Sequence, residues 1–106
     1  MYYAPPVEIY EGVVGLVIDV KIEGVVSLAG VEEAKLYALP PGAKESQEEA
    51  WHVDVIHDDF IFRHIVPQEK PLKAGTYRLQ PSFRLGAYNG RFSTVEFTVY
   101  ERQQRV

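Results

Sequence analysis

The sequence predicts an all-β fold in which seven short antiparallel strands form a sandwich of two sheets. Wherever the chain is periodic, apolar and polar residues alternate with a period of two. No window of a dozen residues carries the apolar stripe of an amphipathic helix without an interrupting Gly or Pro. Because no helix is then available to cover a sheet, the apolar faces of two sheets have to cover each other.

The composition is that of one ordinary globular domain. The chain has 106 residues, of which 46% are hydrophobic and 25% are charged, and this is enough for a single core. We expect one domain over residues 1–106, with flexible tails at residues 1–6 and 102–106. The absence of cysteine excludes disulfides, thiolate metal sites and a cysteine nucleophile.

Four strands are expected in the first half of the chain. They cover residues 7–11, 16–23, 34–39 and 51–55. The Pro-Pro-Gly run at residues 40–42 is a strong turn signal after the third strand. The polar segment that follows is predicted to be a loop, with one helical turn as the alternative. In the fourth strand Trp51 shares the inward side with Val53 and Val55, so it is expected in the core.

Three more strands are expected in the second half, at residues 60–66, 76–85 and 95–100. His57 to Asp59 supplies turn chemistry before the first of them. Between the last two, Asn89 and Gly90 are expected to make the hairpin reversal, because this pair tolerates the positive φ angles of a tight turn. Phe92 breaks the alternation of the final strand, which predicts a bulge or an irregular start near Ser93.

The last hairpin resembles that of bacterial and viral immunoglobulin-like and fibronectin type III-like domains. The resemblance lies in residues 72–79, the long strand after them and the final strand at 95–99, and residues 29–37 resemble the entry into the third strand of such domains. It implies an immunoglobulin-like sandwich in which Tyr77 forms a tyrosine corner, with its ring in the core and its hydroxyl bound to upstream backbone. The missing cysteine pair argues against an antibody-type domain.

Charge is divided unequally along the chain. Through Asp59 there are three basic and twelve acidic residues, a net charge of −9, whereas the remainder has eight basic and three acidic residues, a net charge of +5. Two interpretations follow. The two halves of a sandwich can interleave so that the charges cancel in space, or oppositely charged faces can drive head-to-tail association.

Neither a metal site nor an enzyme active site is expected. The one cluster with the right side chains contains His52, Asp54, His57, Asp58, Asp59 and His64. Strand alternation sends His52 and Asp54 outward and His57 to the side of Trp51, so the group does not converge as zinc or calcium requires. The serines lack a nucleophile-elbow context, and there is no phosphate-binding loop before a helix. We therefore expect no cofactor and no catalysis.

Six residues are the candidates for binding. They are Arg78, Arg84, Tyr88, Asn89, Arg91 and Tyr100. The arginines form an outward basic face, but a pI near 5.3 and the expected cross-strand partner Glu96 make nucleic acid an unfavourable ligand. Tyr88 lies within the Gly86–Gly90 tip and is expected to be displayed there as an anchor.

These observations predict a non-catalytic module for protein association, with virion structural subunit (capsid decoration or tail) as the most specific expectation. Its partner would be a larger assembly or copies of itself. The alternative is an accessory ligand-binding, carbohydrate-binding or spacer module of an exported enzyme or adhesin. No export signal or membrane span is found in the sequence. The location is therefore open between the virion and, for a domain cut from a longer exported protein, the cell exterior.

Overall fold

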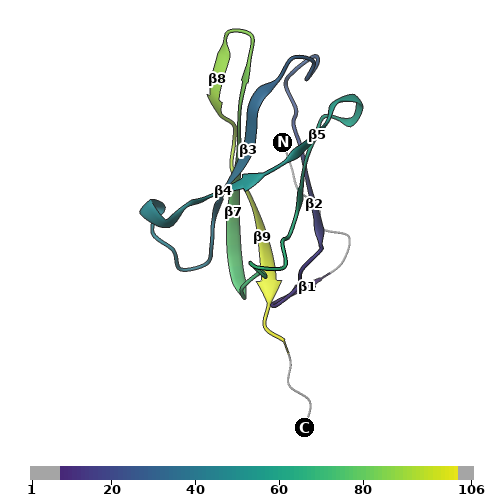
Figure 1. Ribbon diagram of the computed structural model, residues 1–106. Helices are drawn as coiled ribbons and strands as arrows, with labels where there is room; N and C mark the ends of the chain where they lie inside the picture. Colours follow the sequence, from purple (N-terminus) through teal and green to yellow (C-terminus); the bar gives the residue numbers. More distant parts are fainter. Residues whose placement is uncertain (1–7, 103–106) are drawn as a thin grey trace.

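The computed structural model describes residues 8–102, which form two β-sheets. The strands are β1 (Ile9–Tyr10), β2 (Val17–Lys21), β3 (Glu32–Leu39), β4 (Glu49–His52), β5 (Asp54–Ile56), β6 (Ile61–Ile65), β7 (Gly75–Leu85), β8 (Tyr88–Arg91) and β9 (Val95–Tyr100) (Figure 1). The larger sheet has the order β1-β9-β7-β3-β4, with β8 also paired to β7, and the smaller sheet has the order β2-β6-β5. Of the tails predicted at residues 1–6 and 102–106, only Arg102 lies within the described residues.

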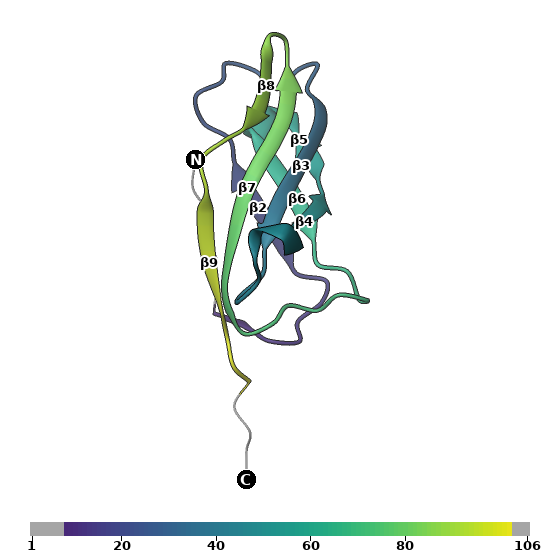
Figure 2. The same ribbon diagram turned by 90° about the vertical axis from the view of Figure 1, so that its left-hand side faces the viewer.

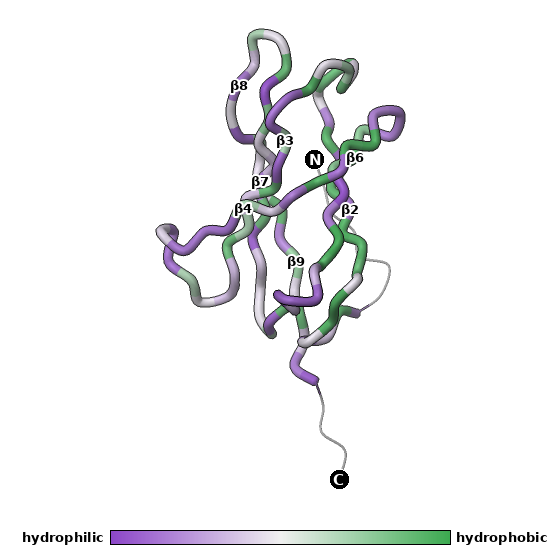
Figure 3. Tube along the Cα trace, viewed as in Figure 1, coloured by the Kyte–Doolittle hydropathy of each residue, from purple (hydrophilic) through white to green (hydrophobic). Residues whose placement is uncertain are grey.

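The all-β prediction is confirmed, but the prediction of seven strands that are all antiparallel is wrong. The described residues contain nine strands, and β1 runs parallel to β9, with Ile9 opposite Val99. Two single 3₁₀ turns, η1 (Glu45–Gln47) and η2 (His57–Asp59), are the only helical elements in this part of the chain. The η1 turn corresponds to the helical alternative for the polar segment, which projects from the side of the molecule (Figure 3).

The predicted fourth strand is in fact two strands that belong to different sheets. Trp51 in β4 pairs with Leu36 of the larger sheet, whereas Val55 in β5 pairs with Phe62 of the smaller one. The chain crosses between the sheets at the buried residue Val53. Apolar and polar residues alternate in β4 and in β5 alike, so this pattern could not distinguish one straight strand from two strands that belong to different sheets.

The β7–β8 hairpin reverses at Gly86 and Ala87, so the prediction of an Asn89–Gly90 turn is wrong. Leu85 and Tyr88 are the last paired residues, which leaves a loop of two residues. Gly86 has a φ of +58° at the first loop position, as a type II′ turn requires. Asn89 and Gly90 are paired within β8. Both Gly86-Ala87 and Asn89-Gly90 contain residues that favour a tight turn, and the pairing of β7 with β8 selects the first as the reversal.

The irregularity expected near Ser93 is confirmed as a gap between β8 and β9. Both strands pair with the same edge of β7, and Pro81 lies in β7 where one gives way to the other. The Pro81 carbonyl accepts a hydrogen bond from the Phe92 N–H at 2.8 Å. The Pro81 nitrogen therefore faces the same gap, where its missing hydrogen costs no ladder hydrogen bond.

The core lies between the two sheets, which overlie each other in Figure 2. Ile18 and Val20 point inward from the smaller sheet, and Leu79 points inward from the larger one, all fully buried. Phe62 of β6 meets Phe83 of β7 edge-on, with ring centroids 5.5 Å apart. Burial of such side chains stabilises the fold by about 1.5–3 kcal/mol each, so the alternation seen in the sequence directly determines which faces meet.

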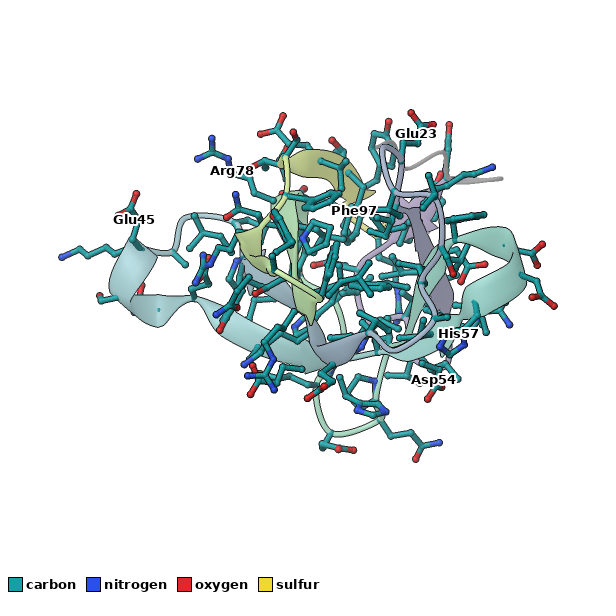
Figure 4. The ribbon with its side chains drawn as sticks, turned by 90° about the horizontal axis from the view of Figure 1, so that it is seen from above. Glu23, Glu45, Asp54, His57, Arg78 and Phe97 are labelled. Carbon is teal, nitrogen blue, oxygen red and sulfur yellow. The ribbon has the colours of Figure 1, made fainter. Side chains whose placement is uncertain are left out.

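Tyr77 has the environment that the resemblance implied. Its ring stacks almost parallel on Phe97, with centroids 5.1 Å apart and an interplanar angle of 6°, and Phe97 points into the sandwich while Arg78 projects outward (Figure 4). The Tyr77 hydroxyl accepts a hydrogen bond from the Lys73 N–H at 2.8 Å. Tyr77 therefore ties the loop before β7 to the core.

The two halves of the chain interleave, so their opposite charges meet inside one molecule. Within residues 8–102, four ion pairs join an acidic residue of the first half to a basic residue of the second. They are Asp19–Arg63, Glu49–Lys70, Glu32–Arg84 and Glu48–Arg91. The charge division along the sequence is thus partly compensated within one molecule, as the first of the two interpretations predicted.

Candidate functional site

The structure brings five of the six candidate residues onto one face. Arg78 and Arg84 both point outward from β7. In the neighbouring strand β8, Asn89 lies opposite Arg84 and Arg91 lies opposite Ser82. All four therefore belong to the outer face of the larger sheet. Tyr100 also points outward, because it alternates with the buried Val99, but it ends β9, which finishes at the opposite end of the molecule from the β7–β8 hairpin (Figure 1). Tyr88 lies opposite Leu85 and therefore has the inward alternation of the hairpin.

Each arginine on this outer face is paired with a glutamate. Arg78 Nε lies 3.3 Å from Glu96, which confirms the expected cross-strand pair. The Arg84 guanidinium donates to Glu32 at 2.6 Å, and this hydrogen bond, together with the charge of Glu32, raises the pKa of Arg84. A phosphate ligand would have to compete with carboxylates already in place, so the face is polar but not strongly cationic.

Arg91 is the most constrained of these side chains. Its guanidinium carbon lies 3.7 Å from the centre of the Tyr37 ring, a cation–π distance. A second contact, at 2.9 Å, joins Arg91 to Glu48, and the hydrogen bond that Arg91 donates to this carboxylate raises the pKa of Arg91. Beside the stack is a hollow of about 460 Å³, which Arg78 and Thr94 also line. A planar cation is thus oriented on the sheet by two neighbouring side chains.

Tyr88 is not displayed at a loop tip, and the prediction of its placement is wrong. Its ring contacts Phe83 at 5.2 Å and Phe92 at 5.1 Å between centroids. The Tyr88 hydroxyl donates to the Arg91 carbonyl at 3.0 Å. These contacts give Tyr88 a structural reason to be aromatic, although 39% of its surface stays exposed. Tyr100 lies beside Tyr10, with centroids 6.1 Å apart, and both rings are exposed.

A second feature, which sequence reasoning missed, is a cleft of about 450 Å³ on the open side of the sandwich, where the chain crosses from β4 to β5. We call it the crossover cleft. It lies between β4, β6 and the loop after β6, and it is lined by Trp51, His64, Pro67, Pro71, Leu72 and Tyr77 among others. Trp51 is 9% exposed and stacks on His64 at 4.3 Å between centroids, so the prediction that Trp51 belongs to the core is confirmed.

Three groups that line the crossover cleft have shifted pKa values. Burial lowers the pKa of His64, whose Nδ1–H donates to the His52 carbonyl at 2.8 Å, so that Nε2 is the acceptor nitrogen of a neutral ring. Burial raises the pKa of Tyr77. Burial alone would raise the pKa of Glu49 too, but hydrogen bonds from Lys70 and Trp51 outweigh it and the pKa is lowered.

The histidine and aspartate cluster does not converge. His52 and Asp54 form an exposed pair, with 3.4 Å between Nε2 and Oδ1, on the rim of the crossover cleft. Asp54 and His57 point away from the sandwich (Figure 4). No three such side chains within residues 8–102 are arranged to hold a metal ion. The signal that could have revealed the cleft was His64, because it occupies an inward position between Phe62 and Val66.

Comparison of the chain with protein-family models, curated proteins and solved structures finds no match. Across the residues that the structure describes, no helix has the length and apolar character needed to cross a membrane.

Proposed function

We propose that this chain is an immunoglobulin-like sandwich that serves as a non-catalytic module for protein association. Immunoglobulin domains carry the strands B, E and D in one sheet and G, F, C and, in the variable type, C′ in the other. The chain order of the strands here supports this assignment, because β2-β6-β5 corresponds to B-E-D and β9-β7-β3-β4 to G-F-C-C′. The Tyr77 hydroxyl bond to Lys73 supports it independently.

The observation that carries the association role is the Arg91–Tyr37 stack on the outer face. Arginine and tyrosine are enriched among the residues that dominate protein interfaces. Here the guanidinium is already oriented by Tyr37 and Glu48, so little side-chain entropy remains to be lost on binding. The adjacent hollow of about 460 Å³ offers space for a partner side chain.

Carbohydrate binding by aromatic stacking, the alternative, is less well supported. Trp51 presents one ring face to His64 and is largely buried, and Tyr88 contacts Phe83 and Phe92. Neither ring therefore presents an open platform of the kind on which a sugar stacks. The more specific idea of a virion subunit rests on family analogy and stays a prediction.

Photo-crosslinking in native host cells tests the association role. Benzoylphenylalanine placed at the exposed Thr94, beside the hollow, is expected to capture a discrete partner protein, whereas the same probe at Lys21 on the smaller sheet is not. Arg91→Glu should abolish the crosslink because it reverses the charge that Tyr37 and Glu48 hold. Equal background labelling from both positions would contradict the proposal. Light scattering at low and high salt then decides whether the partner is a second copy.

A further inference from the structure

His64 is an almost fully buried polar side chain with one ring nitrogen that has no protein partner. Only 6% of the residue is exposed, and its Nδ1–H donates to the His52 carbonyl at 2.8 Å. Within residues 8–102 no hydrogen bond reaches Nε2, yet no fully buried side-chain nitrogen or oxygen of these residues lacks a partner. Nε2 therefore reaches the surface, and the surface that His64 lines is the crossover cleft.

The buried floor of the crossover cleft carries no charge. Its lining residues with at most 9% exposure are Trp51, His64, Val66, Leu72 and Tyr77. Burial lowers the pKa of His64, so its ring is neutral at pH 7. An ion placed on this floor would lose its hydration without gaining a counter-ion. The floor therefore suits a neutral group, and the more exposed Pro67 and Pro71 add apolar walls.

The rim of the crossover cleft favours neither sign of charge. Its charged side chains are three acidic and three basic, namely Glu49, Asp54, Glu69, Arg63, Lys70 and Lys73. Glu49 is bonded to Lys70, and Arg63 is bonded to Asp19 outside the cleft. Lys73 then stands against two carboxylates, those of Asp54 and Glu69. The rim thus gives an anionic ligand no net attraction, and a cation would still meet an uncharged floor.

Two hydrogen-bonding groups stay available beside this floor. Nε2 of the neutral His64 ring is an acceptor, since Nδ1 carries the proton. The Tyr77 hydroxyl accepts from the Lys73 N–H, and its own hydrogen has no acceptor in the part of the chain that the structure describes. Both rings contact Trp51, with centroids 4.3 Å away for His64 and 5.9 Å away for Tyr77. A hydroxyl group, which both donates and accepts, matches this pair.

We propose that the crossover cleft binds a small neutral phenol, whose hydroxyl group donates a hydrogen bond to His64 Nε2. The apolar ring lies between the floor and the two prolines. The volume of about 450 Å³ falls in the range of small-molecule sites, which are mostly apolar with a few polar groups that orient the ligand. This binding goes beyond the association role proposed above. It does not use the Arg91–Tyr37 face, so either site can fail in tests without the other.

Four probes that share a para-ethylphenyl body test this class of ligand. Para-ethylphenol carries the hydroxyl donor, para-ethylanisole masks it with a methyl group, para-ethylbenzoate is an anion and para-ethylbenzylamine is a cation. Each is titrated into the purified full chain and followed by proton–nitrogen NMR correlation spectra, in which the single tryptophan, Trp51, gives one indole N–H signal at the cleft. Para-ethylphenol should shift this signal with a Kd of about 1 mM or lower. It should bind at least about fivefold more tightly than each of the other three.

His64→Asn separates the hydrogen bond from the shape of the cleft. The variant keeps a donor for the His52 carbonyl but has no acceptor at the position of Nε2, so the preference for para-ethylphenol over para-ethylanisole should fall to less than about twofold. The matched control is His57→Asn, because His57 is exposed and does not line the cleft. It should keep the full preference.

Nuclear Overhauser contacts in the wild-type chain keep the test decisive if His64→Asn fails to fold. The ring protons of bound para-ethylphenol should contact those of His64 and Trp51. Equal binding of the phenol and the anisole, tighter binding of either ion, or a preference that survives His64→Asn would overturn the proposal. An unchanged Trp51 signal with every probe would show that Nε2 is bonded to water only, and would overturn it as well.

Discussion

Replacing Tyr77 with phenylalanine isolates one hydrogen bond of the core. The ring would keep its stacking on Phe97, but the Lys73 N–H would lose the acceptor that it contacts at 2.8 Å. Tyr77 is only 4% exposed and the hydrogen bond is partly buried, so its loss should cost about 1–1.5 kcal/mol. With a denaturant slope of about 1–3 kcal/mol per molar urea for a domain of this size, the urea midpoint should fall by roughly 1 M.

Tyr100→Phe is the matched control, because Tyr100 is 48% exposed and its change should stay within about 0.5 kcal/mol. Both variants are compared by urea unfolding followed by fluorescence of the single tryptophan, Trp51. A Tyr77→Phe midpoint equal to that of Tyr100→Phe would refute the reasoning, since water would then satisfy the Lys73 N–H without cost.

Three further predictions concern pH, charge and close packing. His64→Asn keeps a donor for the His52 carbonyl but cannot titrate. Because burial lowers the pKa of His64, the stability of the wild type should fall as the pH drops below about 6.5. Urea unfolding between pH 7.5 and 5 should show a smaller fall in stability for the variant. Arg63→Ala removes two hydrogen bonds to Asp19. The variant should have a slightly lower urea midpoint than wild type, and the difference should vanish near about 1 M NaCl, where salt screens the ion pair. A difference that persists at high salt would show that Arg63 acts through packing. Gly75→Ala would bring a Cβ within 2.5 Å of Pro41 at a φ of +123°; it should cost about 2–4 kcal/mol, and a thermal midpoint like that of wild type would show that the turn moves freely.

Much of the fold was predictable because burial acts on each strand locally. The inward residues of β7 and β9, from Tyr77 to Phe83 and from Val95 to Val99, are the buried ones that alternation identified. The same holds for Ile18 and Val20 in β2. The expected pairing of Arg78 with Glu96 and the Tyr77 corner also follow from neighbours along one hairpin.

The candidate sites were only partly predictable. The outward arginines were identified from strand alternation, but their partners Glu32 and Glu48 are far away in the sequence and depend on sheet pairing. For the crossover cleft, the sequence offered only the inward position of His64 as a signal, and the shape of the cleft depends on where the chain leaves one sheet for the other at Val53.

The sequence by itself determined that the chain is all β and which side of each strand faces the core, because a period of two and turn residues are local properties. Only the tertiary structure decided which strands pair. It determined that residues 51–55 divide between two sheets, that the hairpin turns at Gly86, and that acidic residues of the first half form ion pairs with basic residues of the second. The physical reason is that backbone pairing is almost independent of side-chain identity, so register and partner are selected by the packing of the whole core.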